Sequence, residues 1–491
     1  MRRRSVWKRN LLVLAAVAIP LTVVAGVLFW WKFLKSEAQV FARDDATQRF
    51  KYGSLDAELL AGIPYQIFMV LPRVFPDLVE KYATAGYGPA KPGHGGYGAF
   101  GLAWEEGQRL PVGLSVRRLG FERVTANCAL CHTTSYRFAP DDLPRFAVGG
   151  PGHTVNVQGL LRFLFAAAND RRFSATRLLP EMALQFDFDL LDKAIFALVI
   201  IPKTKLALQL GERELGWIDS KPAWGPGRDD AFNLPKYILS RSPWDDTVGN
   251  TDFPALWRMG DRGGHLLHWG GEAKSVYGVI ATSALGAGSL PTSGFVERNR
   301  WIEAFMDALA PPAFPAEHLD SRLIARGEAL FVAQCAACHA KGGARVGTAI
   351  PLAEIGTDPE HVRTWSQADA ERFNRLLATL GVDQAAMQGA QGYVARPLPG
   401  VWLLAPYLHN GSVPTLRDLL SPPAQRPAVF YRGYDVIDPV NVGFVATGGA
   451  AEARGFRFDT QLKGNGNGGH LYGTDLPAED RDALIEYLKT L

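Results

Sequence analysis

Two short motifs carry the residues best suited to chemistry. Each is a Cys-x-x-Cys pair followed directly by a histidine, and together they use all four cysteines of the 491-residue chain: Cys128, Cys131, His132, Cys335, Cys338 and His339. In this motif both thiols can form thioether bonds to one porphyrin, and the histidine then lies beneath the iron. The motifs therefore predict two covalently bound haem c groups, with His132 and His339 as iron ligands.

Other uses of paired cysteines fit the sequence less well. A zinc ribbon separates its two pairs by about 15–20 residues, whereas about two hundred residues lie between Cys131 and Cys335. A thioredoxin-like redox pair would explain one motif but not the histidine after both. A calcium ion is a possible further cofactor that nothing in the sequence supports. The net charge of +3 on a chain of this size gives no indication of a nucleic-acid partner.

The N-terminus predicts where the haem motifs lie in the cell. Residues 1–10 contain five Arg and Lys, and residues 11–31 contain no charge. As a helix, the second segment would span roughly 31 Å, enough for the hydrocarbon core of a bilayer. The basic residues then lie in the cytoplasm and the bulk of the chain in the periplasm, as a single-pass protein of a bacterial inner membrane. A cleaved signal peptide is the competing interpretation, and it also exports the chain.

The elements around the motifs are expected to be mainly α-helical. The 51 Gly and 32 Pro favour short helices joined by long, ordered loops. Helices are expected over 155–168, 191–201 (stopped by Pro202), 295–309 and 321–334, with a terminal helix from about Pro477. The expected organisation is a cytoplasmic N-terminus (1–10), a transmembrane anchor (11–31), an N-terminal extension (32–90) and two cytochrome-c-like haem domains (91–312 and 313–491).

Several further blocks resemble a known family. Between and after the haem motifs lie Trp224–Arg228, Leu267–Gly271, Ile355–Pro359 and Tyr407–Ser412. With the motifs, they resemble the di-haem cytochrome c peroxidase superfamily, and most closely its rubber-oxygenase-like branch, over about residues 50–491. The resemblance implies a reactive first haem with an open or weakly held sixth position. It also implies a six-coordinate second haem that transfers electrons. Trp269 matches the tryptophan between the two haems, although a packed core tryptophan is the alternative.

The sixth ligand of the second haem is not settled by the sequence. His470, in a Gly-rich loop before the terminal helix, is preferred because members of the superfamily take this ligand from that loop. His409 is the alternative metal ligand, and otherwise an inter-haem or hydrogen-bonding residue. Met387 is isolated in a helix-like segment and is not favoured. His94, in another Gly-rich loop, is a weaker candidate for the distal side of the first haem.

One departure bears on the reaction. Peroxidatic members carry an acidic residue about twenty positions after the bridging tryptophan, but residues 283–289 contain none, and Glu297 comes later. The expected function is therefore reduction of peroxide or activation of oxygen at the first haem, with electrons passed through the second from a small periplasmic cytochrome or cupredoxin. An electron carrier with no substrate chemistry is the alternative. A third possibility is a maturation enzyme that oxidises a partner protein.

Overall fold

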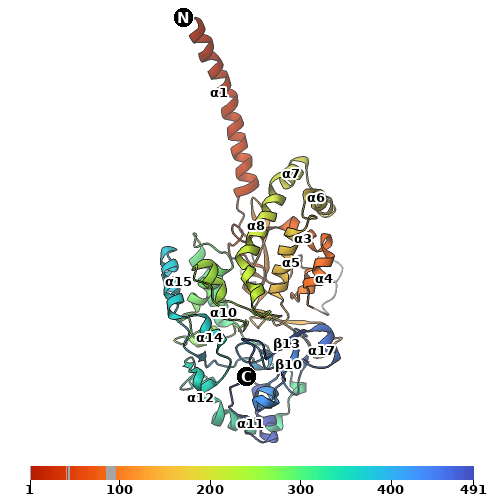
Figure 1. Ribbon diagram of the computed structural model, residues 1–491, viewed down its shortest axis with the longest axis vertical. Coiled ribbons are helices and arrows are strands. Elements are labelled where there is room, and N and C mark those ends of the chain that lie inside the picture. Colours follow the sequence, from red (N-terminus) through yellow and green to blue (C-terminus); the bar gives the residue numbers. More distant parts are fainter. Residues whose placement is uncertain (1, 40, 42–44, 85–95) are drawn as a thin grey trace.

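The computed structural model describes residues 2–39, 41, 45–84 and 96–491 (Figure 1). His94, the candidate distal residue, lies outside this described part. Helices cover about half of the described residues, and the strands are short, with two to six residues each. The mainly α-helical expectation is therefore confirmed only in part, because irregular segments and small sheets make up much of the chain.

The N-terminal helix α1 (Arg2–Phe29) projects from the globular body (Figure 1). It continues through Pro20 and ends in a π-helical turn, η1 (Trp30–Leu34). Residues 12–32 are long and apolar enough to cross a membrane, and none of this stretch is buried. Residues 190–220 also pass this test of length and composition, but part of that segment packs against the body. Helix α1 is thus a candidate anchor or signal sequence.

The region around the first motif combines one small sheet with several helices. Strands β1 (Ile63–Pro64), β3 (Phe121–Ala126) and β2 (Leu114–Leu119) pair antiparallel in that order. The motif follows β3 directly, and hairpin β4–β5 (Thr133–Tyr136, Arg145–Val148) follows the motif. The helices here are α2 (Ala46–Tyr52), α3 (Tyr65–Val74), α4 (Pro76–Tyr82), α5 (Val157–Asn169), α6 (Ala175–Ala183), α7 (Leu190–Ile195), α8 (Ile201–Leu215), α9 (Val276–Gly286) and α10 (Phe295–Ala308).

The C-terminal region is built around two crossing helices. Helix α11 (Ser321–Gln334) leads into the second motif, whose last residues form α12 (Ala336–His339), and α18 (Ala478–Leu488) crosses α11. At Gly327 a Cβ atom would lie 2.0 Å from the carbonyl oxygen of Ala483, so only glycine allows this close approach. The other elements here are α13 (Leu352–Ile355), α14 (Glu360–Thr364), α15 (Gln367–Thr379), α16 (Leu416–Leu419), α17 (Gly449–Arg454) and the paired strands β8–β9 (Ala349–Ile350, Tyr393–Val394), β10–β13 (Val429–Arg432, Phe456–Asp459) and β11–β12 (Ile437–Asp438, Gly443–Phe444).

Most expected helices are confirmed, and one boundary is wrong. Helices α5, α10, α11 and α18 lie within three residues of their expected bounds. Pro202, however, does not stop a helix. A π-helical turn, η4 (Phe196–Ile200), ends there, and Pro202 lies in the first turn of α8, where its missing N–H costs no hydrogen bond.

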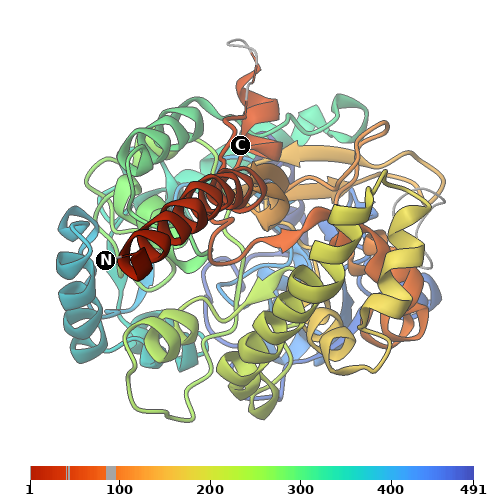
Figure 2. The ribbon, with the colours of Figure 1, turned by 90° about the horizontal axis from the view of Figure 1, so that it is seen from above.

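The two expected haem domains share a hydrophobic core. Tyr136 and Trp257 from the first region are buried with Trp402 and Leu484 from the second. An ion pair between Arg137 and Asp435 also joins the two regions, at 2.7 Å. The division at residues 312 and 313 stays a prediction, but the side chains on its two sides are packed together. Figure 2 shows α5–α8 and α15 on different sides of the base of α1.

Candidate haem sites

The first motif lies in a tight turn that is stabilised by hydrogen bonds at its start and at its histidine. Residues Cys128–Leu130 form the 3-10 turn η3, which Asn127 caps by accepting the Ala129 N–H. The Nδ1 atom of His132 lies 2.8 Å from the carbonyl oxygen of Pro254. A carbonyl can only accept, so Nδ1 carries the proton and Nε2 keeps its lone pair. Burial lowers the pKa of His132 to about 4, which keeps the imidazole in the neutral form that ligates metals.

The second motif repeats this arrangement. The Nδ1 atom of His339 lies 2.7 Å from the carbonyl oxygen of Arg396, which again leaves Nε2 available. Burial also lowers the pKa of His339. Histidines that ligate metals usually donate their other N–H to a carbonyl or carboxylate in this way. Both motif histidines therefore have the surroundings of iron ligands, although the two regions differ in local structure.

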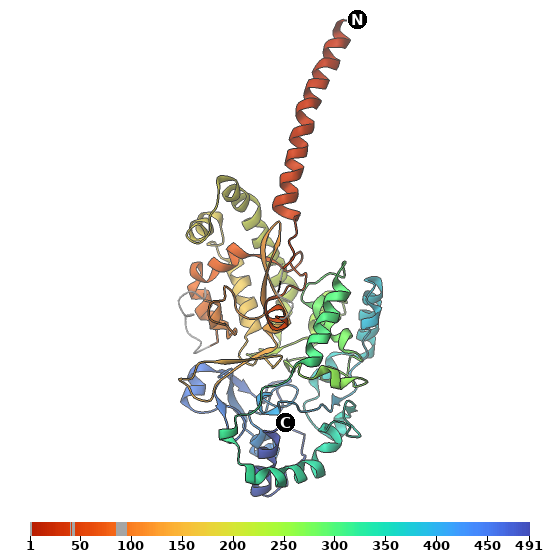
Figure 3. The same ribbon diagram turned by 180° about the vertical axis from the view of Figure 1, so that it is seen from behind.

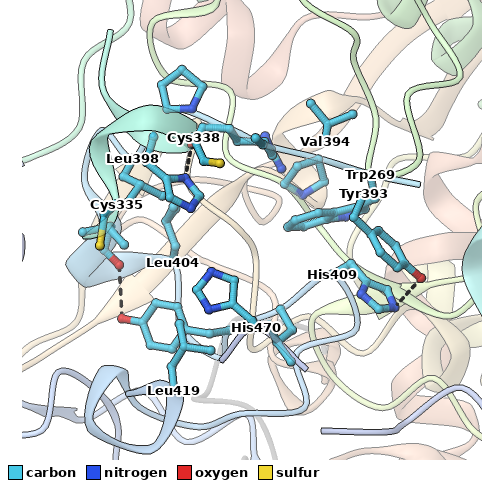
Figure 4. Close-up of a pocket in the computed structure, with 18 of the residues that line it drawn as sticks. Trp269, Cys335, Cys338, Tyr393, Val394, Leu398, Leu404, His409, Leu419 and His470 are labelled. Atoms are coloured by element: carbon cyan, nitrogen blue, oxygen red, sulfur yellow. Dashed lines mark hydrogen bonds between the residues drawn. The ribbon is translucent and has the colours of Figure 1, made fainter. Parts of the chain in front are cut away.

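A largely apolar cavity opens beside the second motif, and His470 faces the motif across it (Figure 4). The rings of His339 and His470 have centres 6.2 Å apart at an angle of 44°. Two metal–nitrogen bonds of about 2 Å each, plus about 1 Å from each nitrogen to its ring centre, place two ligating imidazoles about 6 Å apart. Burial lowers the pKa of His470 to about 3, and its Nδ1 has no hydrogen-bond partner. The residues present therefore fit a haem whose iron would be held by His339 and His470.

The loop that carries His470 is held in a strained shape. His470 has φ of +47°, a left-handed conformation that costs a non-glycine residue roughly 1–2 kcal/mol. Its backbone N–H donates to Ile355, and Gly469 packs so closely on Gly356 that a Cβ would lie 2.3 Å from the Gly356 backbone. The guanidinium of Arg426 donates to the Asn467 carbonyl at 2.6 Å. The block Ile355–Pro359 thus helps to position the His470 loop.

His409 lines the same cavity but lies at its other end, beside Tyr393 (Figure 4). The Tyr393 hydroxyl donates to the Asp358 carbonyl at 2.6 Å and lies 2.9 Å from His409 Nε2. The phenol has one proton, which it donates to Asp358. In the second hydrogen bond, His409 Nε2–H must therefore donate to the Tyr393 hydroxyl oxygen. The two rings also stack, with centres 3.9 Å apart. His409 therefore has a hydrogen-bond partner on Nε2, whereas His470 has none on Nδ1.

Trp269 lies between the backbone segments that receive the two motif histidines. Its Nε1–H donates to the Asp252 carbonyl at 2.9 Å, two residues before Pro254. The guanidinium of Arg396 lies 4.7 Å from the centre of the indole ring. Trp269 also lines the cavity of the second motif (Figure 4). The structure thus connects His132 and His339 to one indole through neighbouring residues.

The two other blocks that resemble the family, Trp224–Arg228 and Tyr407–Ser412, form hydrogen bonds near the His470 loop. The fully buried Arg228 donates to Asn410 and Asn465, and Asn410 in turn donates to the carbonyl of Gly464 in the loop before His470. Arg432 pairs with Asp252, the residue that accepts from Trp269. Burial raises the pKa of Asp252 to about 6, against the opposing effect of Arg432.

Some notable residues were not found from the sequence. Glu272, three residues after Trp269, and His361 are almost completely buried. Oε1 of Glu272 lies 3.4 Å from Nε2 of His361. An acidic residue was expected about twenty positions after Trp269, at 283–289, where the structure places the end of α9 and Ser289, whose hydroxyl donates to the Leu55 carbonyl. Glu272 is the first carboxylate after Trp269 and was visible in the sequence, whereas nothing in the spacing marks His361.

Comparison with known families supports a cytochrome c identity for the C-terminal part. Residues 322–391 match the family model of cbb3-type cytochrome c oxidase subunit III, and residues 392–431 match RoxA-like, cytochrome c-like proteins. The first match contains the second haem motif, and the second contains Tyr393, Arg396 and His409. These matches support a cytochrome c-like domain, and hence covalently bound haem and a role in electron transfer.

Two relatives come from Sinorhizobium fredii (strain NBRC 101917 / NGR234). Uncharacterized protein y4iJ is 30% identical over 255 residues, which cover 37% of this chain and 41% of the relative. Uncharacterized protein y4iM is 31% identical over 284 residues, which cover 49% of this chain and 64% of the relative. The chain thus matches less than two thirds of the length of either relative.

Proposed function

We propose that this chain is a di-haem c-type cytochrome that reduces peroxide or activates oxygen at the first haem, with electrons passed through the second. It is anchored in the bacterial inner membrane by residues 11–31, with the body in the periplasm, and it accepts electrons from a small cytochrome or cupredoxin. Bound haem supplies an iron that changes oxidation state by one electron. The side chains described above hold that group and connect the two sites.

One observation carries the proposal. The carbonyls that accept from the two motif histidines belong to Pro254 and Arg396; Arg396 itself contacts Trp269, and Pro254 lies two residues after Asp252, which accepts from the indole. A chain that bound a single haem would have no need for a second motif histidine with the same hydrogen bond. Trp269 is proposed as the relay because it contacts both segments.

The two sites differ in a way that suits different tasks. His470 faces His339 at the spacing of a second axial ligand, so the second haem is proposed to be six-coordinate and to transfer electrons. His409 is the less favoured ligand because Tyr393 already bonds its Nε2. No described carboxylate lies within residues 283–289, which favours a small ligand that needs no acid–base cleavage at that position. The first haem is therefore proposed as the reactive one.

Haem counting and spin state test the proposal. A pyridine haemochrome assay should give two haems per chain, and both should resist acid–acetone extraction because thioether bonds do not dissociate. The electron paramagnetic resonance spectrum of the oxidised protein should show one high-spin and one low-spin haem, and peroxide should alter the high-spin signal. One haem per chain would refute the di-haem proposal. Two low-spin haems that are unchanged by peroxide would instead indicate an electron carrier.

A further inference from the structure

A group of leucines projects into solvent at the end of the body nearest helix α1. Leu184, Leu190, Leu191 and Leu198, named here the leucine ridge, are 71%, 86%, 49% and 78% exposed. Single exposed leucines are common on protein surfaces, but these four come from one short stretch of chain, residues 184–198, over the end of α6, α7 and the turn η4, and such a concentration is typical of an interaction site. We propose that the leucine ridge lies in the interfacial layer of the same membrane that holds α1, an inference that rests on the proposed anchor.

Three leucines of the ridge, Leu190, Leu191 and Leu198, belong to a segment whose other side chains are part of the core. Phe196, Ile200 and Ile201 are buried among the aromatic residues of the first region. Further along, Gln209 on α8 donates to the Ala168 carbonyl of α5. The segment 190–220 is therefore fixed as part of the globular body, although its length and composition would allow it to span a membrane. Its exposed leucines remain available to contact lipid.

The position of the ridge relative to α1 identifies the membrane as its partner. Lys32, at the end of the apolar stretch, forms an ion pair with Asp192 on α7. Figures 1 and 3 show α6 and α7 extending from the body on the same side as α1. If residues 11–31 span the bilayer, Trp30 and Trp31 lie in the interfacial layer and Lys32 at the headgroups. The ion pair then places the start of α7 at the headgroup level.

The charges near the ridge limit how deeply it enters. Asp187 and Asp189 are exposed beside the leucines, and Asp189 also caps α7 by accepting the Asp192 N–H. Carboxylates are costly in the hydrocarbon core, so the ridge reaches only the headgroup and upper acyl region. Leu206 and Leu210 on α8 are 56% and 47% exposed but lie about 20 Å or more further along the helix from Asp192. These two leucines should stay in water.

Nitroxide labels on introduced cysteines test the depth of the ridge. The full chain is placed in nanodiscs of phosphatidylethanolamine and phosphatidylglycerol, with single substitutions Leu190→Cys, Leu198→Cys and Leu210→Cys. The ratio of collision rates with oxygen and with a nickel chelate increases with depth in lipid. We expect this ratio to be severalfold higher at position 190 than at 210, with 198 between them. Val440→Cys, which is 63% exposed in the C-terminal region, serves as the water-exposed control.

The outcomes separate this inference from the proposed function. Val17→Cys in α1 should show the highest ratio; a water-like value there would refute the anchor itself. A lipid-like value at position 17 with equal ratios at 190 and 440 would refute only the ridge. Dipolar broadening at both 190 and 210 would indicate a second copy of the chain on this face and would also refute it. The unsubstituted chain should take up no label, because labelling would show that its cysteines are not bonded to haem.

Discussion

Replacement of His470 gives a decisive test of the second haem site. Both His470→Ala and His470→Gly remove the imidazole that faces His339 at 6.2 Å between ring centres. Because this spacing accommodates an iron between the two rings, we expect both variants to convert the second haem from low spin to high spin, with the first haem unchanged. Added imidazole should fill the vacated space and restore the low-spin spectrum.

The two variants should differ in stability, and the backbone gives the size of the difference. Position 470 has φ of +47°, which alanine adopts at a cost of roughly 1–2 kcal/mol and glycine adopts freely. Glycine loses more conformational entropy on folding, by roughly 0.5–1 kcal/mol. The glycine variant should therefore be more stable to denaturant than the alanine variant by about 1 kcal/mol.

Electronic spectra, electron paramagnetic resonance and chemical unfolding measure these effects. His409→Phe is the matched control, because it removes the other imidazole of the cavity but should leave the second haem low-spin. The reasoning is refuted if both His470 variants keep the low-spin signal, or if His409→Phe alone produces the high-spin form. An alanine variant as stable as the glycine variant would show that the loop relaxes away from the described conformation.

Three further predictions concern the relay, the helix crossing and acid stability. Trp269→Ala should slow electron transfer between the haems in flash-photolysis kinetics while haem content and ligation stay normal; unchanged kinetics with a lower melting temperature would make Trp269 a packing residue. Gly327→Ala should destabilise the protein by about 2 kcal/mol, since overpacking against the Ala483 backbone costs about 3 kcal/mol and better helix propensity returns about 1, whereas Gly286→Ala, in open space at the end of α9, should stabilise it by up to about 1 kcal/mol in the same denaturant titration. An imidazole that ligates iron must be neutral, and burial lowers the pKa of His470 in the same direction, so the unfolded chain binds this proton first and stability is lost as pH falls below 6.5; melting temperature should therefore fall less steeply in acid in His470→Gly than in the unsubstituted protein.

The sequence predicted best the motifs and helices that depend on residues close together in the chain. The Cys-x-x-Cys-His motifs predicted the positions of the candidate haem sites, and the periodicity before the second motif predicted helix α11 at its observed bounds. The predicted helix end at Pro202 was wrong because proline is common both after a helix and in the first turn of one. No sequence pattern indicated the π-helical turn before Pro202.

The contacts that complete the sites could not be predicted in this way. The acceptors of the motif histidines are the backbone carbonyls of Pro254 and Arg396, and any residue can supply a carbonyl. The buried pair Glu272 and His361 joins positions almost ninety residues apart. The place of His470 was predicted from a family resemblance, but its distance from His339 follows only from the fold.

The interlocking of the two regions has a consequence for biogenesis. In the proposed di-haem protein, export from the N-terminus would present Cys128–His132 to the haem-attachment machinery long before Arg396 and His470 have emerged. The first haem would then be attached while the residues around it are still incomplete, and the core shared by Trp257 and Leu484 would form last. Covalent attachment suits this order, because a haem held only by its pocket would have no complete pocket to bind during synthesis.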